Sequence, residues 1–78
     1  SGVVKVEPNP AHDFVLIRFA NSNPNRTISI FNSSLQLINE MKAFERFVKI
    51  DINDFSNGIY FLQIEDGKSA VLKKLVKY

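Results

Sequence analysis

The fold of this chain is decided by the stretch Ile50-Asp51-Ile52-Asn53-Asp54-Phe55-Ser56-Asn57-Gly58-Ile59-Tyr60-Phe61-Leu62-Gln63-Ile64. At its start, residues 47–52 alternate apolar and polar side chains, the pattern of a half-buried strand. Residues 53–58 are turn formers that end in Gly58, which reaches positive φ at little cost. Residues 59–64 are β-branched and aromatic, and at first apolar on both faces. This last run therefore predicts the central strand of a two-layer β core.

Weaker strand patterns surround this stretch. They cover residues 3–6, 14–19, 27–31, 35–41 and 70–78. In residues 35–41 neither the odd nor the even positions are consistently apolar, so the sequence does not decide which side of this strand faces the core. Residues 42–45 form a short connection in which one helical turn would fit. With turn signals roughly every 8–12 residues, these patterns predict an all-β sandwich of about seven strands.

The apolar parity of the strands also predicts the core. The residues expected between the two sheets are Val15, Ile17, Ile28, Ile30, Val48, Ile50, Tyr60, Leu62 and Ile64. Phe61 and Gln63 should be less buried than Tyr60 and Leu62, because side chains alternate along a strand. A tyrosine that opens a sandwich strand commonly buries its ring and returns its hydroxyl to the backbone.

The composition fits one small domain. The chain has 78 residues, of which 45% are hydrophobic. A chain of this size buries only about 60% of the surface that its unfolded form exposes, so it depends on efficient packing. It has no cysteine, which excludes a disulfide framework and a Cys-ligated zinc site. Its net charge of +2 is too balanced for a nucleic-acid reader, and no apolar run is long enough to span a membrane.

Signals for catalysis and metal binding are weak. His12 is the only histidine, and it lies in a proline-rich corner where it is expected to be solvated. Residues 51–54 begin like a calcium loop, but Phe55 and Ser56 stand where a ligand and a glycine are needed. We interpret residues 51–54 as turn formers instead. The sequence therefore predicts no enzyme, no cofactor and no metal site.

Three motifs follow one another along the chain. They are Pro8-Asn9-Pro10-Ala11 after the first strand, Asn57-Gly58-Ile59-Tyr60-Phe61-Leu62 at the central strand, and the closing Leu72-Lys73-Lys74-Leu75-Val76-Lys77-Tyr78. In this order and spacing, residues 4–78 resemble the C-terminal sorting domain of proteins exported by the type IX (Por) secretion system of Bacteroidetes. The resemblance implies a seven-stranded immunoglobulin-like sandwich at the end of a cargo protein.

The resemblance also implies a function. In that family the domain is a non-catalytic secretion signal. The cargo crosses the inner membrane with an ordinary signal peptide and folds in the periplasm, and translocon components at the outer membrane then recognise the domain. A sortase-like signal peptidase usually removes it, and the cargo is anchored at the cell surface or secreted. On this interpretation residues 1–78 are a single sorting domain without its cargo, and Ser1-Gly2 is an expression remnant.

Eight residues are predicted to carry recognition. They are Pro8, Asn9, Pro10, Gly58, Tyr60, Lys73, Lys74 and Lys77. The prolines would stiffen a corner, because each fixes φ and removes a backbone donor. Gly58 and Tyr60 would set the central strand. The lysines are the candidates for direct contact with the translocon, and the alternative is a solvated edge that blocks aggregation.

Two positions depart from the family pattern. Glu7 precedes Pro-Asn-Pro where the family usually has an apolar or aromatic residue, and Leu35 stands where a turn usually has glycine. Because a bulky residue is poorly suited to positive φ, that turn is expected to change shape or to shift onto Asn32.

The competing function is an adhesive or carbohydrate-binding module, which requires an outer aromatic platform that brings Phe47 and Phe61 together. A third hypothesis is a spacer that only separates its neighbours.

Overall fold

The computed structural model describes residues 4–78 and contains seven strands in that range. The strands are β1 (Lys5–Glu7), β2 (Phe14–Arg18), β3 (Thr27–Asn32), β4 (Leu37–Lys42), β5 (Phe47–Asp51), β6 (Gly58–Glu65) and β7 (Ala70–Lys77). Within the described range, no helix is long and apolar enough to cross a membrane. The predicted remnant Ser1-Gly2 and the predicted strand start at Val3 lie outside the described residues.

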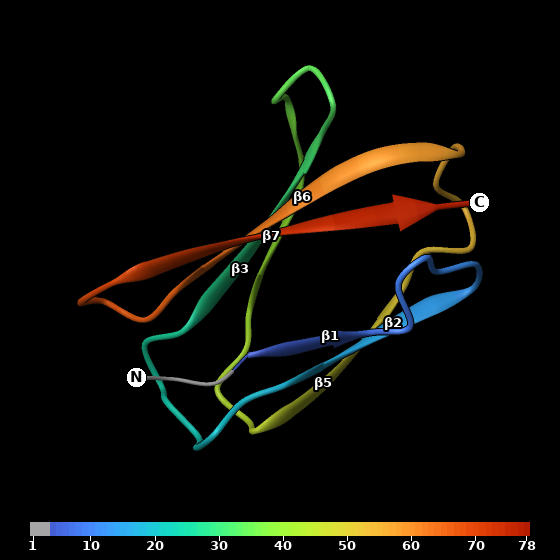
Figure 1. Cartoon of the computed structure of the whole chain (residues 1–78). Helices are drawn as coiled ribbons and strands as arrows, with labels where there is room; N and C mark the ends of the chain where they lie inside the picture. The colour runs from blue at the N-terminus through green and yellow to red at the C-terminus, as the bar shows by residue number, and fades with distance from the viewer. Residues whose placement is uncertain (1–3) are drawn as a thin grey trace.

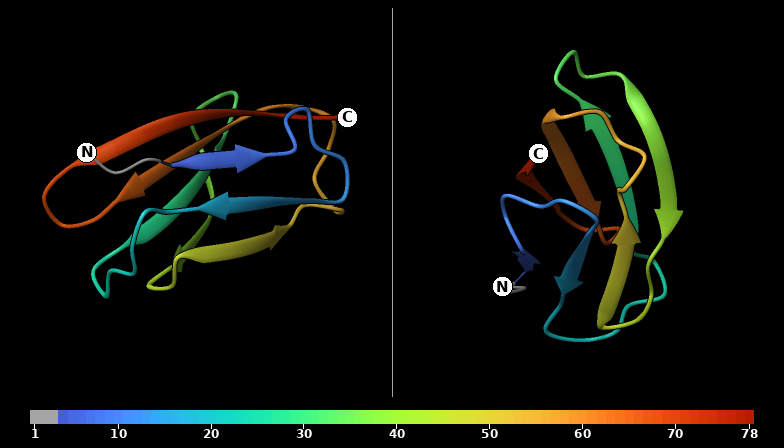
Figure 2. Two further views of the ribbon diagram at one scale, coloured as in Figure 1. Left: turned by 60° about the horizontal axis from the view of Figure 1, so that its bottom comes forward. Right: turned by 90° about the vertical axis from the view of Figure 1, so that its right-hand side faces the viewer.

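The strands form two antiparallel sheets that face each other. Figure 1 shows β3, β6 and β7 in one layer and β1, β2 and β5 in the other, and Figure 2 shows the same two layers from other sides. The strand orders are β1-β2-β5 and β4-β3-β6-β7. β5 and β6 belong to different sheets, so residues 52–57 carry the chain from one layer to the other. β6 lies between β3 and β7, which confirms the prediction that it is a central strand.

The core occupies the space between the sheets. Every residue predicted for it is buried except Val48, which is half-buried and packs against the others. Phe61 and Gln63 are half-buried, whereas Tyr60 and Leu62 are buried, so the predicted register of β6 is confirmed. Full burial of one such aliphatic side chain contributes about 1.5–3 kcal/mol to folding. Ala11, Phe19, Ala43, Ile52 and Leu75 complete the core.

The turn between β3 and β4 differs from its prediction. Leu35 itself adopts a φ of +63°, so the positive φ stays at Leu35 and does not shift onto Asn32. The Oδ1 atom of Asn32 instead accepts the N–H groups of Ser34 at 2.9 Å and Gln36 at 3.0 Å. The Leu35 side chain is 68% exposed, so it meets solvent rather than another strand. β4 consequently begins at Leu37, two residues later than predicted.

The structure also explains why the parity of β4 was ambiguous. Ile30 of β3 pairs with Asn39, but its neighbour Phe31 pairs with Leu37, so Ile38 is an extra residue at a bulge. A bulge breaks the alternation of side chains between the two faces. Residues 43–46 then join β4 to β5 without the helical turn for which the sequence left room.

Candidate recognition site

The first predicted motif pairs directly with the last strand through Asn9. The Nδ2 group of Asn9 donates to the Lys74 carbonyl oxygen at 2.9 Å. Its Oδ1 atom accepts the Val76 N–H at 3.0 Å. These partners lie 65 and 67 positions away along the chain. Asn9 therefore joins the beginning of the domain to its end.

The two prolines explain why a side chain makes this contact. Pro8 and Pro10 have no backbone N–H, so neither can donate to the edge of a sheet. The carboxamide of asparagine carries one donor group and one acceptor, like a peptide unit. Asn9 therefore takes the place of a strand residue at the edge of β7. Sequence reasoning predicted a stiff corner and missed its partner, although an Asn between two prolines was a usable signal.

Ala11 continues the same contact with backbone groups. Its N–H donates to the Val76 carbonyl at 2.7 Å, and its carbonyl accepts the Tyr78 N–H at 3.0 Å. Ala11 forms a parallel bridge with Lys77, and its side chain is fully buried. Figure 2 (left) shows this segment, the blue loop after β1, reaching the red end of β7. We call residues 8–11 together with residues 74–78 the corner clamp.

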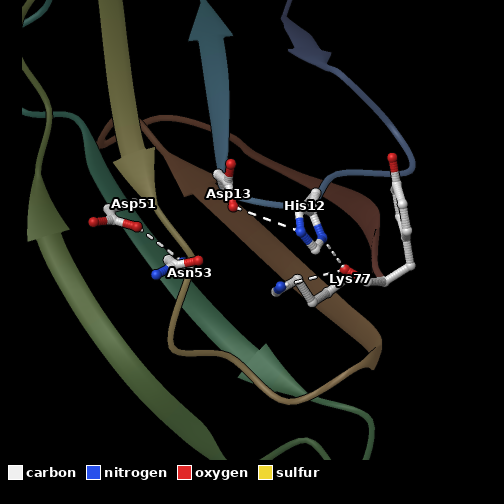
Figure 3. Close-up of polar contacts among 6 residues, drawn as sticks. His12, Asp13, Asp51, Asn53 and Lys77 are labelled. Atoms are coloured by element: carbon white, nitrogen blue, oxygen red, sulfur yellow. Dashed lines mark hydrogen bonds and ion pairs between the residues drawn. The ribbon is translucent and has the colours of Figure 1, made fainter.

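His12 adds a contact at the end of the clamp. Its Nδ1 hydrogen-bonds the carbonyl oxygen of Tyr78, and its Nε2 lies 3.7 Å from Oδ1 of Asp13 (Figure 3). The His12 and Tyr78 rings lie with their centroids 5.3 Å apart. The side chain of His12 is 61% exposed, as expected for a loop residue, but it also holds the end of the chain.

The three lysines of β7 lie in three different environments. Lys74 is exposed on the outer face of its sheet, opposite Phe61 of β6. Lys73 is half-buried, and Lys77 is only 5% exposed. The Nζ group of Lys77 donates to the Tyr78 carbonyl at 3.3 Å (Figure 3). The alternative, that all three lysines form a solvated edge, is therefore wrong for Lys77, which shares the inward parity of buried Leu75.

Gly58 and Tyr60 control the start of β6. Gly58 has a φ of +148°, a conformation that side chains rarely tolerate, and an added Cβ would find no atom within 4 Å. Tyr60 is 7% exposed, and its hydroxyl donates to the Ser56 carbonyl at 2.7 Å. Its ring lies beside Phe55, with the centroids 5.0 Å apart. The predicted burial and hydroxyl bond of Tyr60 are confirmed.

The acidic segment before β6 forms a turn. Oδ1 of Asp51 accepts the Asn53 N–H at 2.9 Å (Figure 3), and the Phe55 N–H donates to the Ile52 carbonyl at 3.0 Å. These bonds confirm the turn-forming role predicted for residues 51–54. Within residues 4–78, no three His, Cys, Asp or Glu side chains are grouped so that they could hold a metal ion.

Arg26, which belongs to none of the three sequence motifs, joins the loops at the other end of β2. Its guanidinium donates to the carbonyls of Ala43 at 3.2 Å and Glu45 at 3.0 Å. It also donates to the carbonyl of Asn21 at 2.7 Å, and its Cζ lies 3.7 Å from the ring centroid of Phe19. Burial lowers the pKa of Arg26, but an arginine stays charged in proteins. Arg26 thus acts as a structural connector.

The aromatic platform required by the competing function is not formed by its predicted residues. Phe47 lies on β5 and Phe61 on β6, in opposite sheets. Phe47 faces outward with Arg18, whose Cζ is 5.6 Å from its ring centroid. Phe61 is half-buried beside Phe31 on the outer face of the other sheet. The condition that the competing function sets for Phe47 and Phe61 is therefore not met.

The two sheets and the corner that crosses between them define an immunoglobulin-like β-sandwich. The family model described as "Secretion system C-terminal sorting domain" matches residues 5–78. The chain belongs to this family, and the domain is a C-terminal sorting signal of type IX secretion. This confirms the family and the main function that the three motifs indicated. The competing adhesive or carbohydrate-binding function is not favoured.

One similar solved structure is PorZ, described as a bacterial surface component of the type IX secretion system of Porphyromonas gingivalis. The TM-score is 0.75 at 18% sequence identity, and the match covers 96% of this chain. It covers 11% of the PorZ chain, so the present chain spans only a small part of that protein's length. At this identity the likeness concerns the fold. None of the curated proteins matches the chain.

Proposed function

We propose that residues 1–78 are one non-catalytic sorting domain that is recognised in its folded form by translocon components at the outer membrane. The attached cargo crosses the inner membrane first and folds in the periplasm. After export, a sortase-like peptidase separates the domain from the cargo, which reaches the cell surface or the medium. Family membership supports export, while the route and the individual partners are the proposal.

The observation that carries this proposal is the corner clamp. Asn9 and Ala11 bind the backbone of β7, so two family motifs from opposite ends of the chain form one surface. An unfolded chain would not hold these two segments together. A receptor that contacts both can therefore distinguish a folded domain from an unfolded one.

Within this surface, Lys74 and Lys73 are the proposed direct contacts. Lys74 is an exposed residue of the clamp itself, and Lys73, the residue before it on β7, is half-buried. We assign Lys77 a supporting role instead, because it is only 5% exposed. Pro8, Asn9 and Pro10 shape the surface, and Gly58 and Tyr60 support it from β6.

The test is export of a folded reporter fused upstream of the domain. The variant Lys73→Gln/Lys74→Gln should fold normally, because surface changes usually alter stability by less than about 0.5 kcal/mol each. Its reporter should accumulate in the periplasm at the expense of the cell surface. The matched control is Lys42→Gln/Lys49→Gln, which removes two exposed lysines from β4 and β5. Equal export of both variants, with equal melting curves, would show that the β7 lysines do not contribute to recognition.

A further inference from the structure

We infer that the first half of β7 is a docking edge to which an extended, acidic segment of a partner protein adds as a further strand. This inference rests on the proposed function, because it specifies how a partner would contact the same strand. The docking edge consists of residues 70–73 and the N–H of Lys74.

Among residues 4–78, no strand pairs with the outer side of the docking edge. β7 is the last strand of its sheet, and β6 is its only neighbouring strand among the described residues. The clamp uses the outward groups of Lys74, Val76 and Tyr78, so the even-numbered residues of β7 face away from β6. The N–H and C=O groups of Ala70 and Leu72 therefore point outward as well. Within residues 4–78 no hydrogen bond to these groups closes that side.

The shape of the docking edge suits a new strand. β7 pairs with β6 through eight consecutive residue pairs without a bulge, so its edge is regular. Native edges are commonly blocked by a proline, a bulge or charged side chains. This half of β7 has no proline and no bulge, and its charges are the lysines Lys73 and Lys74, which oppose self-pairing but suit an acidic strand. Leu72 is 63% exposed and lies opposite Gln63 on the outer face. An added strand would cover Leu72 and gain backbone hydrogen bonds at the same time.

The charges around the docking edge select an acidic partner. Lys73 and Lys74 stand at one end of it, and Lys68 lies in the turn at the other. Of the nearby acidic residues, Asp66 already accepts backbone N–H groups within that turn, and Glu65 lies on β6 opposite Ala70. Carboxylates on the added strand would therefore meet lysines. A second copy of this chain would bring lysines near lysines, which opposes self-pairing.

The direct test is peptide binding to the domain, followed by NMR. The probe is a short synthetic peptide of alternating Val and Glu. It should shift the amide signals of residues 70–74 and bind at least about tenfold more tightly than a Val and Lys peptide of the same length. The same Val and Glu peptide with N-methylated amides should not bind, because it cannot donate to the edge. Equal affinity of all three peptides would overturn the inference.

Two variants separate backbone from charge. Leu72→Pro should abolish binding and keep the fold, because the lost N–H points outward and proline is tolerated at such edge positions. Leu72→Ser keeps that N–H and should retain most of the affinity. Lys73→Glu/Lys74→Glu leaves the backbone intact and should reverse the preference toward the Val and Lys peptide. If this charge reversal left the preference unchanged, the inference would be wrong even if Leu72→Pro failed to fold.

The outcome also separates this inference from the proposed function. Loss of export in Lys73→Gln/Lys74→Gln without any binding of the Val and Glu peptide would preserve the sorting function and overturn strand addition. Peptide binding to the domain, together with unchanged export of Lys73→Gln/Lys74→Gln, would support strand addition. It would also show that this edge has no role in sorting. Concentration-dependent self-association that Leu72→Pro abolishes would identify a second copy as the occupant, which also overturns the inference.

Discussion

Asn9 accepts the amide proton of Val76 through its side-chain Oδ1 at 3.0 Å, so a side chain of the first connection completes the edge of the last strand. With the bond from its Nδ2 to the Lys74 carbonyl, it covers part of an edge that would otherwise expose unpaired groups. The coverage stops at Lys74. The clamp thus protects the second half of β7 and leaves the first half for the proposed partner.

Replacing Asn9 tests the clamp. Asn9→Ala removes two hydrogen bonds and should lower the free energy of unfolding by about 1–2 kcal/mol. Asn9→Asp should cost at least as much, because it turns a carboxylate oxygen toward the Lys74 carbonyl. Urea unfolding measures both changes. Asn53→Ala is the matched control, since the Asn53 side chain is exposed and makes no hydrogen bond to residues 4–78. Equal midpoints for Asn9→Ala and Asn53→Ala would contradict a stabilising clamp.

Gly58 should not tolerate any side chain. Its φ of +148° lies far from the left-handed helical region near about +57° that asparagine tolerates. Gly58→Ala and Gly58→Asn should therefore both destabilise by about 1 kcal/mol or more. The cause is backbone conformation, because the space around the position is open. Thermal melting measures the loss, and a variant that melts at the wild-type temperature would show that this backbone relaxes without cost.

Leu35 should respond in the opposite direction. Its φ of +63° lies within the left-handed region, which costs an ordinary residue about 1–2 kcal/mol. Leu35→Gly and Leu35→Asn relieve that cost and lose little packing, so each should stabilise by roughly 0.5 kcal/mol or more. Leu37→Gly is the control, because it weakens an exposed strand position without relieving positive φ. If the Leu35 variants melted lower than the wild type, the side chain would have a packing role.

Lys77 and Lys74 should differ in stability although both are lysines of β7. The stem of Lys77 is buried, so Lys77→Ala should cost about 1–2 kcal/mol through lost packing and a lost hydrogen bond. Lys77→Met keeps the stem and should lose less. Lys74→Ala should remain within about 0.5 kcal/mol of the wild type. Chemical denaturation compares the three variants, and equal losses at both positions would contradict burial of Lys77.

The sequence predicted what local periodicity can determine. Alternation placed Ile28, Ile30 and Leu62 on inward faces, and the structure pairs Ile30 directly with Leu62. Tyr60 was also predictable, because a tyrosine at the start of a sandwich strand has a recurring environment. In both cases neighbours along the chain carry the information.

The features that the sequence did not predict depend on partners that lie far apart along the chain. The bond between Asn9 and Val76 joins residues 67 positions apart. An Asn between two prolines indicates a side chain that replaces a backbone partner, but the local sequence does not say which strand it binds. The bulge at Ile38 depends on how β3 and β4 pair. Lys77 was different, since the inward parity of Leu75 was available in the sequence. The prediction treated the three lysines of β7 alike, although a lysine can bury its stem while its ammonium group finds an acceptor.

Asp66 gives the turn between β6 and β7 a predictable dependence on pH. Its Oδ1 accepts the N–H groups of Lys68 and Ser69, each at 2.9 Å. The backbone bonds from Ser69 and then Lys68 favour the carboxylate and lower its pKa below the ordinary value. The folded pKa is therefore lower than the unfolded pKa. The stability that the charge contributes is present above the unfolded pKa, near about 3.9, and is lost as the pH falls through the folded pKa.

The variant Asp66→Asn isolates this contribution. It keeps a side-chain oxygen for the two N–H groups but carries no charge at any pH. The wild type should melt at a higher temperature than Asp66→Asn at neutral pH, and the gap should close as the pH falls below the folded pKa of Asp66. Other carboxylates titrate in both proteins, so the difference between the two melting curves reports on Asp66. A gap that stayed constant down to strongly acidic pH would show that the turn depends on the shape of the side chain and not on its charge.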